Sequence, residues 1–117
     1  MQKREAKLQV LFKHYLSSVG WSQSSVFELK QSQTDTLRKG SLLPHQRDSL
    51  LNAKHSTLYH KLPDDTIGYK PFDCFLLANV SAFVVIKFRS GVVMVDIDNY
   101  AEPLHFETAK KIGKIIF

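Results

Sequence analysis

The chain has 117 residues, of which 44% are hydrophobic and 23% charged, and its 16 lysines and arginines outnumber 11 acids to give a formal net charge of +5. This length suits one compact domain, residues 1–117, and the composition excludes a disordered chain. The single cysteine, Cys74, can neither form an internal disulfide nor build a structural zinc site, so we expect a reducing compartment. The most apolar run, residues 82–86, is far shorter than the ~18–20 residues that cross a bilayer, so no membrane segment is expected.

The first predicted element is a helix over residues 2–17. Its apolar residues recur at a spacing of three and four, which is typical of one buried helix face: Leu8, Leu11, Phe12, Tyr15 and Leu16. Glu5 lies at the top of the same face. It has two interpretations, a first-turn acid that favours the helix dipole or a carboxylate that serves a site.

A strand is predicted over residues 25–31. Because strand side chains alternate between faces, Glu28 and Lys30 should project from the face opposite to Phe27. The polar stretch 32–41 that follows is predicted to be a loop.

A second helix is predicted to begin at Pro44, which suits a first helical turn, and to run to about Lys54. One polar side chain, Gln46, then lies on an otherwise apolar face. The other members of that face are Leu43, Leu50 and Ala53.

Three extended segments follow, over residues 57–62, 72–77 and 82–89, and a hairpin turn is predicted from the last of them into residues 92–97. A short basic helix is predicted over residues 108–116. The resulting order, α-β-α-β-β-β-α, indicates an α/β domain with a small mixed sheet flanked by helices.

The tripeptide Glu28-Leu29-Lys30 indicates the chemistry. An acid and a lysine two residues apart on a strand project together, which suits metal-assisted hydrolysis of a phosphodiester. The carboxylate would bind Mg²⁺, a hard cation that prefers oxygen ligands. The lysine would orient or help to deprotonate the attacking water and stabilise charge on the phosphate. A solvated edge of the sheet is the alternative interpretation.

Further polar side chains are expected at the same corner of the sheet. Gln46 faces inward from the second helix, and Glu5 does so from the first. Asp73 lies on a predicted strand where Phe72 and Cys74 point the other way. Isolated polar groups on apolar faces are costly unless satisfied, so several together indicate a site.

Three motifs follow one another in the chain: Val26-Phe27-Glu28-Leu29-Lys30, Leu43-Pro44-His45-Gln46 and Ala82-Phe83-Val84-Val85-Ile86-Lys87-Phe88. Their order resembles the PD-(D/E)xK nuclease superfamily, and within it the RecU-type Holliday-junction resolvases and their small phage relatives. The resemblance covers roughly residues 3–90. It implies a restriction-endonuclease-like mixed sheet flanked by helices.

The resemblance also implies roles for single residues. Glu28 would bind the metal and Lys30 would act on the water. Gln46 would steady the site or contact phosphate, and Glu5 would complete the outer metal shell.

The chain departs from the family's pattern at one point. The aspartate that normally precedes the acid-x-Lys strand has no counterpart in residues 17–25, which contain no acid. Asp73 is the best substitute, since a neighbouring strand could deliver its carboxylate to Glu28, and both would then bind Mg²⁺ or Mn²⁺. Without such a substitute, the site is inactive.

Basic residues elsewhere favour contacts with a DNA backbone, which give affinity without sequence recognition. These residues are Lys3, Arg4, Lys7, Lys39, Lys110, Lys111 and Lys114, for which a solvated helix face is the alternative. His45 is interpreted either as a phosphate contact or as a surface histidine at a helix start.

Two acids and the cysteine are predicted to play no part in catalysis. Asp96 and Asp98 share a strand face without an accompanying lysine, so a solvated face is favoured over a second metal pair. Cys74 is predicted to be a small buried hydrophobe and not a nucleophile.

The predicted function is therefore a Mg²⁺-dependent DNA endonuclease that acts on branched or recombining DNA. Because a resolvase cuts two strands symmetrically, a two-fold homodimer is expected. A phage origin is expected, and with it the cytoplasm of a bacterial host. The alternative is a catalytically inactive protein of the nuclease fold that binds nucleic acid or a protein partner.

Overall fold

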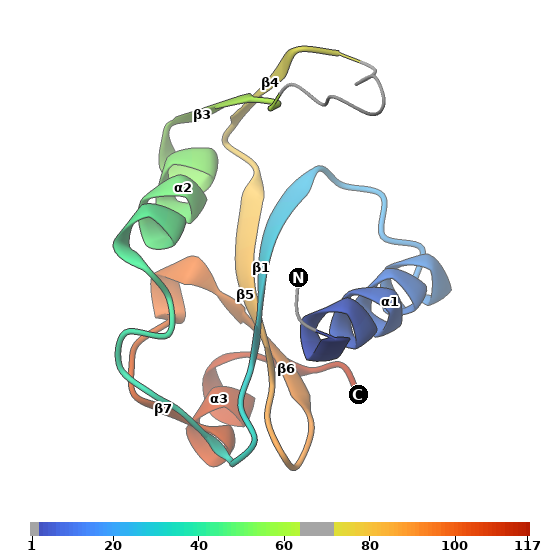
Figure 1. Cartoon of the computed structure of the whole chain (residues 1–117), viewed down its shortest axis with the longest axis vertical. Helices are drawn as coiled ribbons and strands as arrows, with labels where there is room; N and C mark the ends of the chain where they lie inside the picture. Colours follow the sequence, from blue (N-terminus) through green and yellow to red (C-terminus); the bar gives the residue numbers. More distant parts are fainter. Residues whose placement is uncertain (1–2, 64–71) are drawn as a thin grey trace.

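Four strands form the main sheet of the computed structural model, which describes the backbone of residues 3–63 and 72–117 and, within the first helix, the side chains from Lys7 onward (Figure 1). They are β1 (Ser25–Gln31), β5 (Ser81–Lys87), β6 (Val92–Asp96) and β8 (Lys114–Ile115), in the order β1-β5-β6-β8. β1 pairs parallel with β5, while β6 runs antiparallel to both β5 and β8. The sheet is therefore mixed.

Helices cover both faces of this sheet. They are α1 (Lys3–Ser18), α2 (Pro44–His55) and α3 (Phe106–Ile112). α1 buries Leu8 and Phe12 in one apolar cluster, whereas α2 and α3 contribute Leu50 and Ala109 to the other. Figure 1 shows α1 and α2 on opposite sides of the sheet. The mixed α/β architecture with flanking helices is thus confirmed, although the specific restriction-endonuclease-like order is not.

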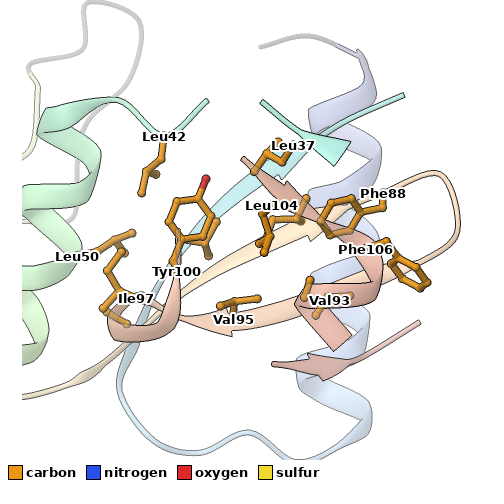
Figure 2. Packing of buried hydrophobic residues seen from close by; sticks show 14 residues of the cluster. Leu37, Leu42, Leu50, Phe88, Val93, Val95, Ile97, Tyr100, Leu104 and Phe106 are labelled. Atoms are coloured by element: carbon orange, nitrogen blue, oxygen red, sulfur yellow. The ribbon is translucent and has the colours of Figure 1, made fainter. Parts of the chain in front are cut away.

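The central strand β5 explains why both faces need a cover. Val84 and Ile86 belong to the cluster under α2 and α3, Val85 belongs to the cluster under α1, and all three are fully buried. Figure 2 shows the first of these clusters, in which the Tyr100 ring lies with Ile97 and other apolar side chains between α2 and the sheet. Alternating side chains on one strand therefore tie the two layers together.

Two small sheets lie outside the main one. β2 (Thr36–Leu37) pairs with β7 (Leu104–His105), and β3 (Thr57–Lys61) pairs with β4 (Cys74–Ala78), both antiparallel. A single turn of 3-10 helix, η1 (Ile97–Asn99), follows β6. The β3–β4 hairpin extends beyond the end of the main sheet next to α2 (Figure 1).

Most of the predicted elements are confirmed, with ends that shift by a few residues. The predicted loop 32–41 contains the two-residue strand β2, which its polar sequence did not indicate. The predicted helix 108–116 begins earlier and ends at Ile112, because the chain then turns through Gly113 into β8. None of the helices in the described part of the chain is long and apolar enough to cross a membrane.

Gly113 is expected to tolerate no larger residue. A Cβ atom there would lie 2.4 Å from the carbonyl oxygen of Met94 and 2.9 Å from the side chain of Val95, both in the core strand β6. Gly113→Ala should therefore lower the free energy of unfolding by roughly 1–3 kcal/mol in a urea titration. Thr108→Ala, at an exposed position of the preceding helix α3, is the control and should change the free energy of unfolding by less than about 0.5 kcal/mol. Equal stability of the two variants would contradict this expectation.

Candidate functional site

A pocket of about 450 Å³ lies beside β1, between α1 and α2. β1 is the end strand of the main sheet, and within the described residues it pairs with β5 alone, so its other edge is open to this pocket. The lining comes from three elements: Gln9, Phe12, Lys13 and Leu16 of α1, residues 27–30 of β1, and Gln46 of α2. Residues from both faces of the strand therefore meet at its open edge.

Glu28 and Lys30 form an ion pair at the centre of the pocket lining. Lys30 Nζ lies 3.5 Å from Glu28 Oε1, and the side chains are 17% and 31% exposed for the lysine and the glutamate respectively. The predicted alternation is confirmed, because Phe27 packs into the cluster under α1 on the opposite face. Each charge is thus partly shielded from water and held by the other, while both stay accessible.

Gln46 joins α2 to this ion pair. Its amide Nε2 donates a 3.0 Å hydrogen bond to Glu28 Oε1, and its Oε1 accepts a 3.0 Å hydrogen bond from the backbone N–H of Leu43. Both ends of the amide are therefore fixed. The lysine and the glutamine both contact Oε1 of Glu28, and no hydrogen bond within the described residues involves Oε2.

A second carboxylate, Glu102, holds the loop that precedes α2. Its two oxygens accept 2.7 Å hydrogen bonds from the backbone N–H groups of Gly40 and Leu42, and the Tyr100 hydroxyl donates to it as well. Arg47 of α2 lies 5.6 Å from the centre of the Tyr100 ring. Through Leu42 and the adjacent backbone, Glu102 steadies the first turn of α2, which carries Gln46.

The contact between Glu102 and Tyr100 shifts the pKa values of both groups. Burial opposes ionisation of Glu102, but the hydrogen bonds from Tyr100, Leu42 and Gly40 outweigh it and lower the pKa of the carboxyl group. Burial, followed by the hydrogen bond to Glu102, raises the pKa of the Tyr100 phenol well above its ordinary value. At neutral pH the pair is therefore a phenol donating to a carboxylate.

Asp73 is not brought to the pocket. The expectation that a strand neighbouring β1 carries it is wrong, because that neighbour is β5, whereas Asp73 directly precedes β4 in the separate hairpin sheet. Both edges of β5 are already occupied by β1 and β6, so β4 pairs with β3 instead. Asp73 is exposed and does not line the pocket, so the geometry gives no support to its role as a metal ligand beside Glu28.

None of the predicted DNA-contacting residues is among the described residues that line the pocket. Lys114 lies on β8, at the opposite end of the main sheet from β1. Glu5, Lys3 and Arg4 are on α1, but their side chains lie outside the described residues. Other members of the set are exposed, namely Lys7, Lys39, His45, Lys111 and Lys114. Lys110 differs, because it pairs with Glu107 at 2.8 Å and its Nζ lies 5.1 Å from the centre of the Phe106 ring. DNA contact by these residues stays a prediction.

Asp96 and Asp98 do have a lysine beside them, contrary to the sequence interpretation. Lys54 of α2 reaches across to place its Nζ 2.7 Å from Asp96 Oδ1 and 2.5 Å from Asp98 Oδ2, and His55 Nε2 lies 2.7 Å from Asp98 Oδ1. The hydrogen bonds from Lys54 and then His55 lower the pKa of Asp98, and those to Asp96 and then Asp98 raise the pKa of Lys54. The lysine ammonium thus provides the positive charge between these carboxylates.

Cys74 is exposed, so its predicted burial is wrong. It lies on the outward face of the β3–β4 hairpin, opposite Lys61 in the strand register. The apolar neighbours that suggested burial, Phe72 and Leu76, are themselves more than half exposed. The hairpin therefore has one face that nothing in the described part of the chain covers.

Among the described residues, the pocket offers Mg²⁺ a single carboxylate ligand. Glu28 is the one carboxylate among the described residues that line the pocket, and no group of three or more His, Cys, Asp or Glu side chains in that part of the chain is arranged to hold a metal. Mg²⁺ commonly keeps several waters and is held by one or two carboxylates together with substrate phosphates. Glu28 could therefore share such an ion with the phosphate of a bound substrate.

No protein-family model, curated protein or solved structure matches this chain. The features that indicate a function are therefore the side chains of Glu28, Lys30 and Gln46, which meet at the open edge of β1. Sequence reasoning singled out all three of these residues. It missed Glu102, which lies 60 residues from Leu42 and carries no local signal, and Lys13, which reads as an ordinary solvent-face lysine of α1.

Glu102→Gln is expected to destabilise the protein at neutral pH, because an amide cannot accept from three donors as the carboxylate does. The loss should be roughly 1–3 kcal/mol by urea titration at pH 7. Since folding lowers the pKa of Glu102, its contribution is present above the unfolded pKa of about 4.3 and is lost as the pH falls through the folded value. The stabilities of wild type and variant should therefore converge towards pH 3. Glu107→Gln, an exposed glutamate of α3, is the control. A constant difference between pH 7 and pH 3 would argue against this role.

Proposed function

We propose that this protein is a Mg²⁺-dependent endonuclease of the PD-(D/E)xK type, with a restriction-endonuclease-like sheet and with branched or recombining DNA as its substrate. The observation that carries the proposal is the contact of Glu28 with both Lys30 and Gln46 in one partly shielded pocket. The three residues come from two of the three motifs whose order suggested the superfamily. Their meeting at the open edge of β1 supports the proposal because a strand of DNA needs access from outside.

Glu28 is the residue that would hold the metal ion, through Oε2, because Oε1 is already engaged. When bound, Mg²⁺ supplies positive charge to a phosphate oxygen and makes a water molecule more acidic. Gln46 acts as the positioning residue: its fixed amide sets the orientation of the Glu28 carboxylate before substrate arrives. Such preorganisation avoids reorienting the group during the reaction.

Lys30 serves as the electrostatic stabiliser. The contact with Glu28 keeps Lys30 Nζ in the pocket, where it can donate a hydrogen bond to an oxygen of the substrate. As a phosphate enters the pocket, the ammonium can turn from the carboxylate to a non-bridging oxygen, where negative charge increases in the transition state. The nearby cation Lys13 adds to the attraction for the anionic substrate.

Symmetric cleavage of a branched substrate requires two sites related by a two-fold axis, so the proposal includes a homodimer. The net charge of +5 favours association with DNA at low salt. Exposed lysines of α1 and α3 are the proposed contacts to the DNA backbone, including Lys7 and Lys111.

Cleavage of branched DNA tests the proposed nuclease activity directly. Purified protein with Mg²⁺ or Mn²⁺ should cut four-way junctions, and Lys30→Gln should lower the single-turnover rate on the order of 100- to 1000-fold, the loss typical of one transition-state donor. Glu28→Gln should abolish the activity. The matched control is Lys61→Gln, which removes the same charge from the exposed face of the β3–β4 hairpin and should cut like wild type. The proposal fails if wild type leaves junction, flap and single-stranded DNA intact.

A second candidate function is a nuclease-fold protein that binds DNA without cutting it. The specific observation in its favour is that Glu28 is the one carboxylate among the described residues lining the pocket. A site with a single carboxylate binds Mg²⁺ weakly unless the substrate adds its own oxygens. The two functions therefore differ in whether the metal ion strengthens DNA binding.

Metal dependence of DNA affinity separates the two candidates. Lys30→Gln provides the background, because it should retain Glu28 while leaving the DNA largely intact during the measurement. For the nuclease, Mg²⁺ should tighten junction binding by this variant in fluorescence anisotropy, and the additional change Glu28→Gln should remove the effect. For the binding protein, Kd should be the same with Mg²⁺ or EDTA in both variants. A matched concentration of NaCl, adjusted for ionic strength, controls for screening.

A further inference from the structure

A second hollow lies where β1 and β5 end. Two adjoining cavities of about 280 and 400 Å³ share three residues, the last of β1 and the two that follow it: Gln31, Ser32 and Gln33. The loop after β1 lines one side, and the end of β5 lines the other. Because β1 and β5 are parallel, both deliver their carboxyl ends to this place, where open α/β sheets commonly bind ligands.

The hollow is positively charged. Its cations are Arg38, Lys87 and Arg89, and none of them forms an ion pair within the described part of the chain. Asp35 attracts Arg89, but its two carboxylate oxygens are engaged by Ser90, through the backbone N–H at 2.8 Å and the hydroxyl at 2.6 Å. No carboxylate is among the described residues that line either cavity. The charge pattern therefore favours an anion.

Gln31 adds a requirement for a hydrogen-bond donor. Its side-chain Oε1 is buried and has no partner within the described residues. A buried acceptor without a partner is rare in native proteins, and a ligand N–H or O–H group can satisfy it once the Gln31 side chain turns toward the hollow that this residue lines. The β1–β5 register pairs Gln31 with Lys87, so the two side chains leave the sheet next to each other on the same face. A ligand here would meet a cation and an amide acceptor together.

We propose that this hollow binds one nucleotide unit of a nucleic-acid strand. Its phosphate lies against Lys87 and Arg89, and an N–H or O–H of its base or sugar donates to Gln31. This inference deepens the proposed function and rests on it, because Gln31 directly follows Lys30, roughly 3.3 Å along the same strand. The two side chains leave opposite faces of β1, so a DNA strand whose scissile phosphate lies at Lys30 would pass around the open edge of β1 to reach the hollow.

The test measures binding separately from cleavage. Full-length protein in EDTA is titrated into a fluorescent single-stranded oligonucleotide at several salt concentrations. Lys87→Gln and Arg89→Gln should each reduce the slope of log Kd against log salt by about 0.7, the value for one phosphate contact with a single strand. Lys61→Gln, on the hairpin, removes an equal charge outside the hollow and should leave the slope unchanged. Lys87→Arg keeps the charge and should keep the slope, which excludes a general folding defect.

A second measurement identifies the ligand contact. In NMR spectra of wild type, the side-chain amide resonance of Gln31 should shift as the oligonucleotide is added, and Gln31→Ala should bind several-fold more weakly at every salt concentration. Inorganic phosphate is titrated separately. If phosphate shifts the amide while the oligonucleotide does not, the hollow is a site for free anions and the proposal is overturned. Equal slopes for Lys87→Gln and Lys61→Gln overturn it as well.

Failure of this inference and failure of the nuclease proposal give different results. If wild type cuts DNA but Lys87→Gln and Arg89→Gln keep the wild-type slope, the nuclease stands and the hollow is not part of its substrate path. If wild type cuts nothing but both variants lose slope, the hollow binds a nucleic-acid strand in a protein without catalysis.

Discussion

The parallel pairing of β1 with β5 is the constraint on which the rest of the structure depends. It places Glu28 and Lys30 beside Val84 and Ile86, whose burial under α2 is complete, and so holds the two charged residues at the rim of a rigid core. A parallel pair also needs a crossover connection, which here contains α2 and with it Gln46. One pairing thus assembles all three side chains of the candidate site.

The same pairing explains why the site is accessible. β5 lies between β1 and β6, so β1 is left at the end of the sheet with an open edge. Exposed edges are normally protected against pairing with other chains, and charged side chains such as Glu28 and Lys30 serve that purpose. At this edge the protection and the proposed chemistry require the same residues, which is why a solvated edge and a site are hard to distinguish from the tripeptide alone.

Long-range contacts set the precision of the site. Gln46 can hold Glu28 only if the first turn of α2 is fixed, and the loop before that turn is anchored by Glu102 from a distant part of the chain. Burial of Tyr100 in the core holds the partner that donates to Glu102. The packing of the apolar cluster around Tyr100, which Figure 2 shows, is in this way linked to the orientation of the Glu28 carboxylate.

The sequence alone determined the local structure and the face on which each side chain lies. Strand alternation placed Glu28 and Lys30 together, and helical spacing placed Gln46 on the inner side of α2, because both periods depend only on near neighbours. The sequence did not indicate two-residue strands such as β2 and β8, because so short a segment shows no alternation of apolar and polar residues. Only the tertiary structure decided which strands pair, and therefore that Asp73 belongs to a separate hairpin. It also decided that Glu102 accepts hydrogen bonds from the loop before α2. The physical reason is that several strands could pair with β5, which has only two edges. β1 and β6 occupy these edges, and no local sequence pattern indicates which strands will do so.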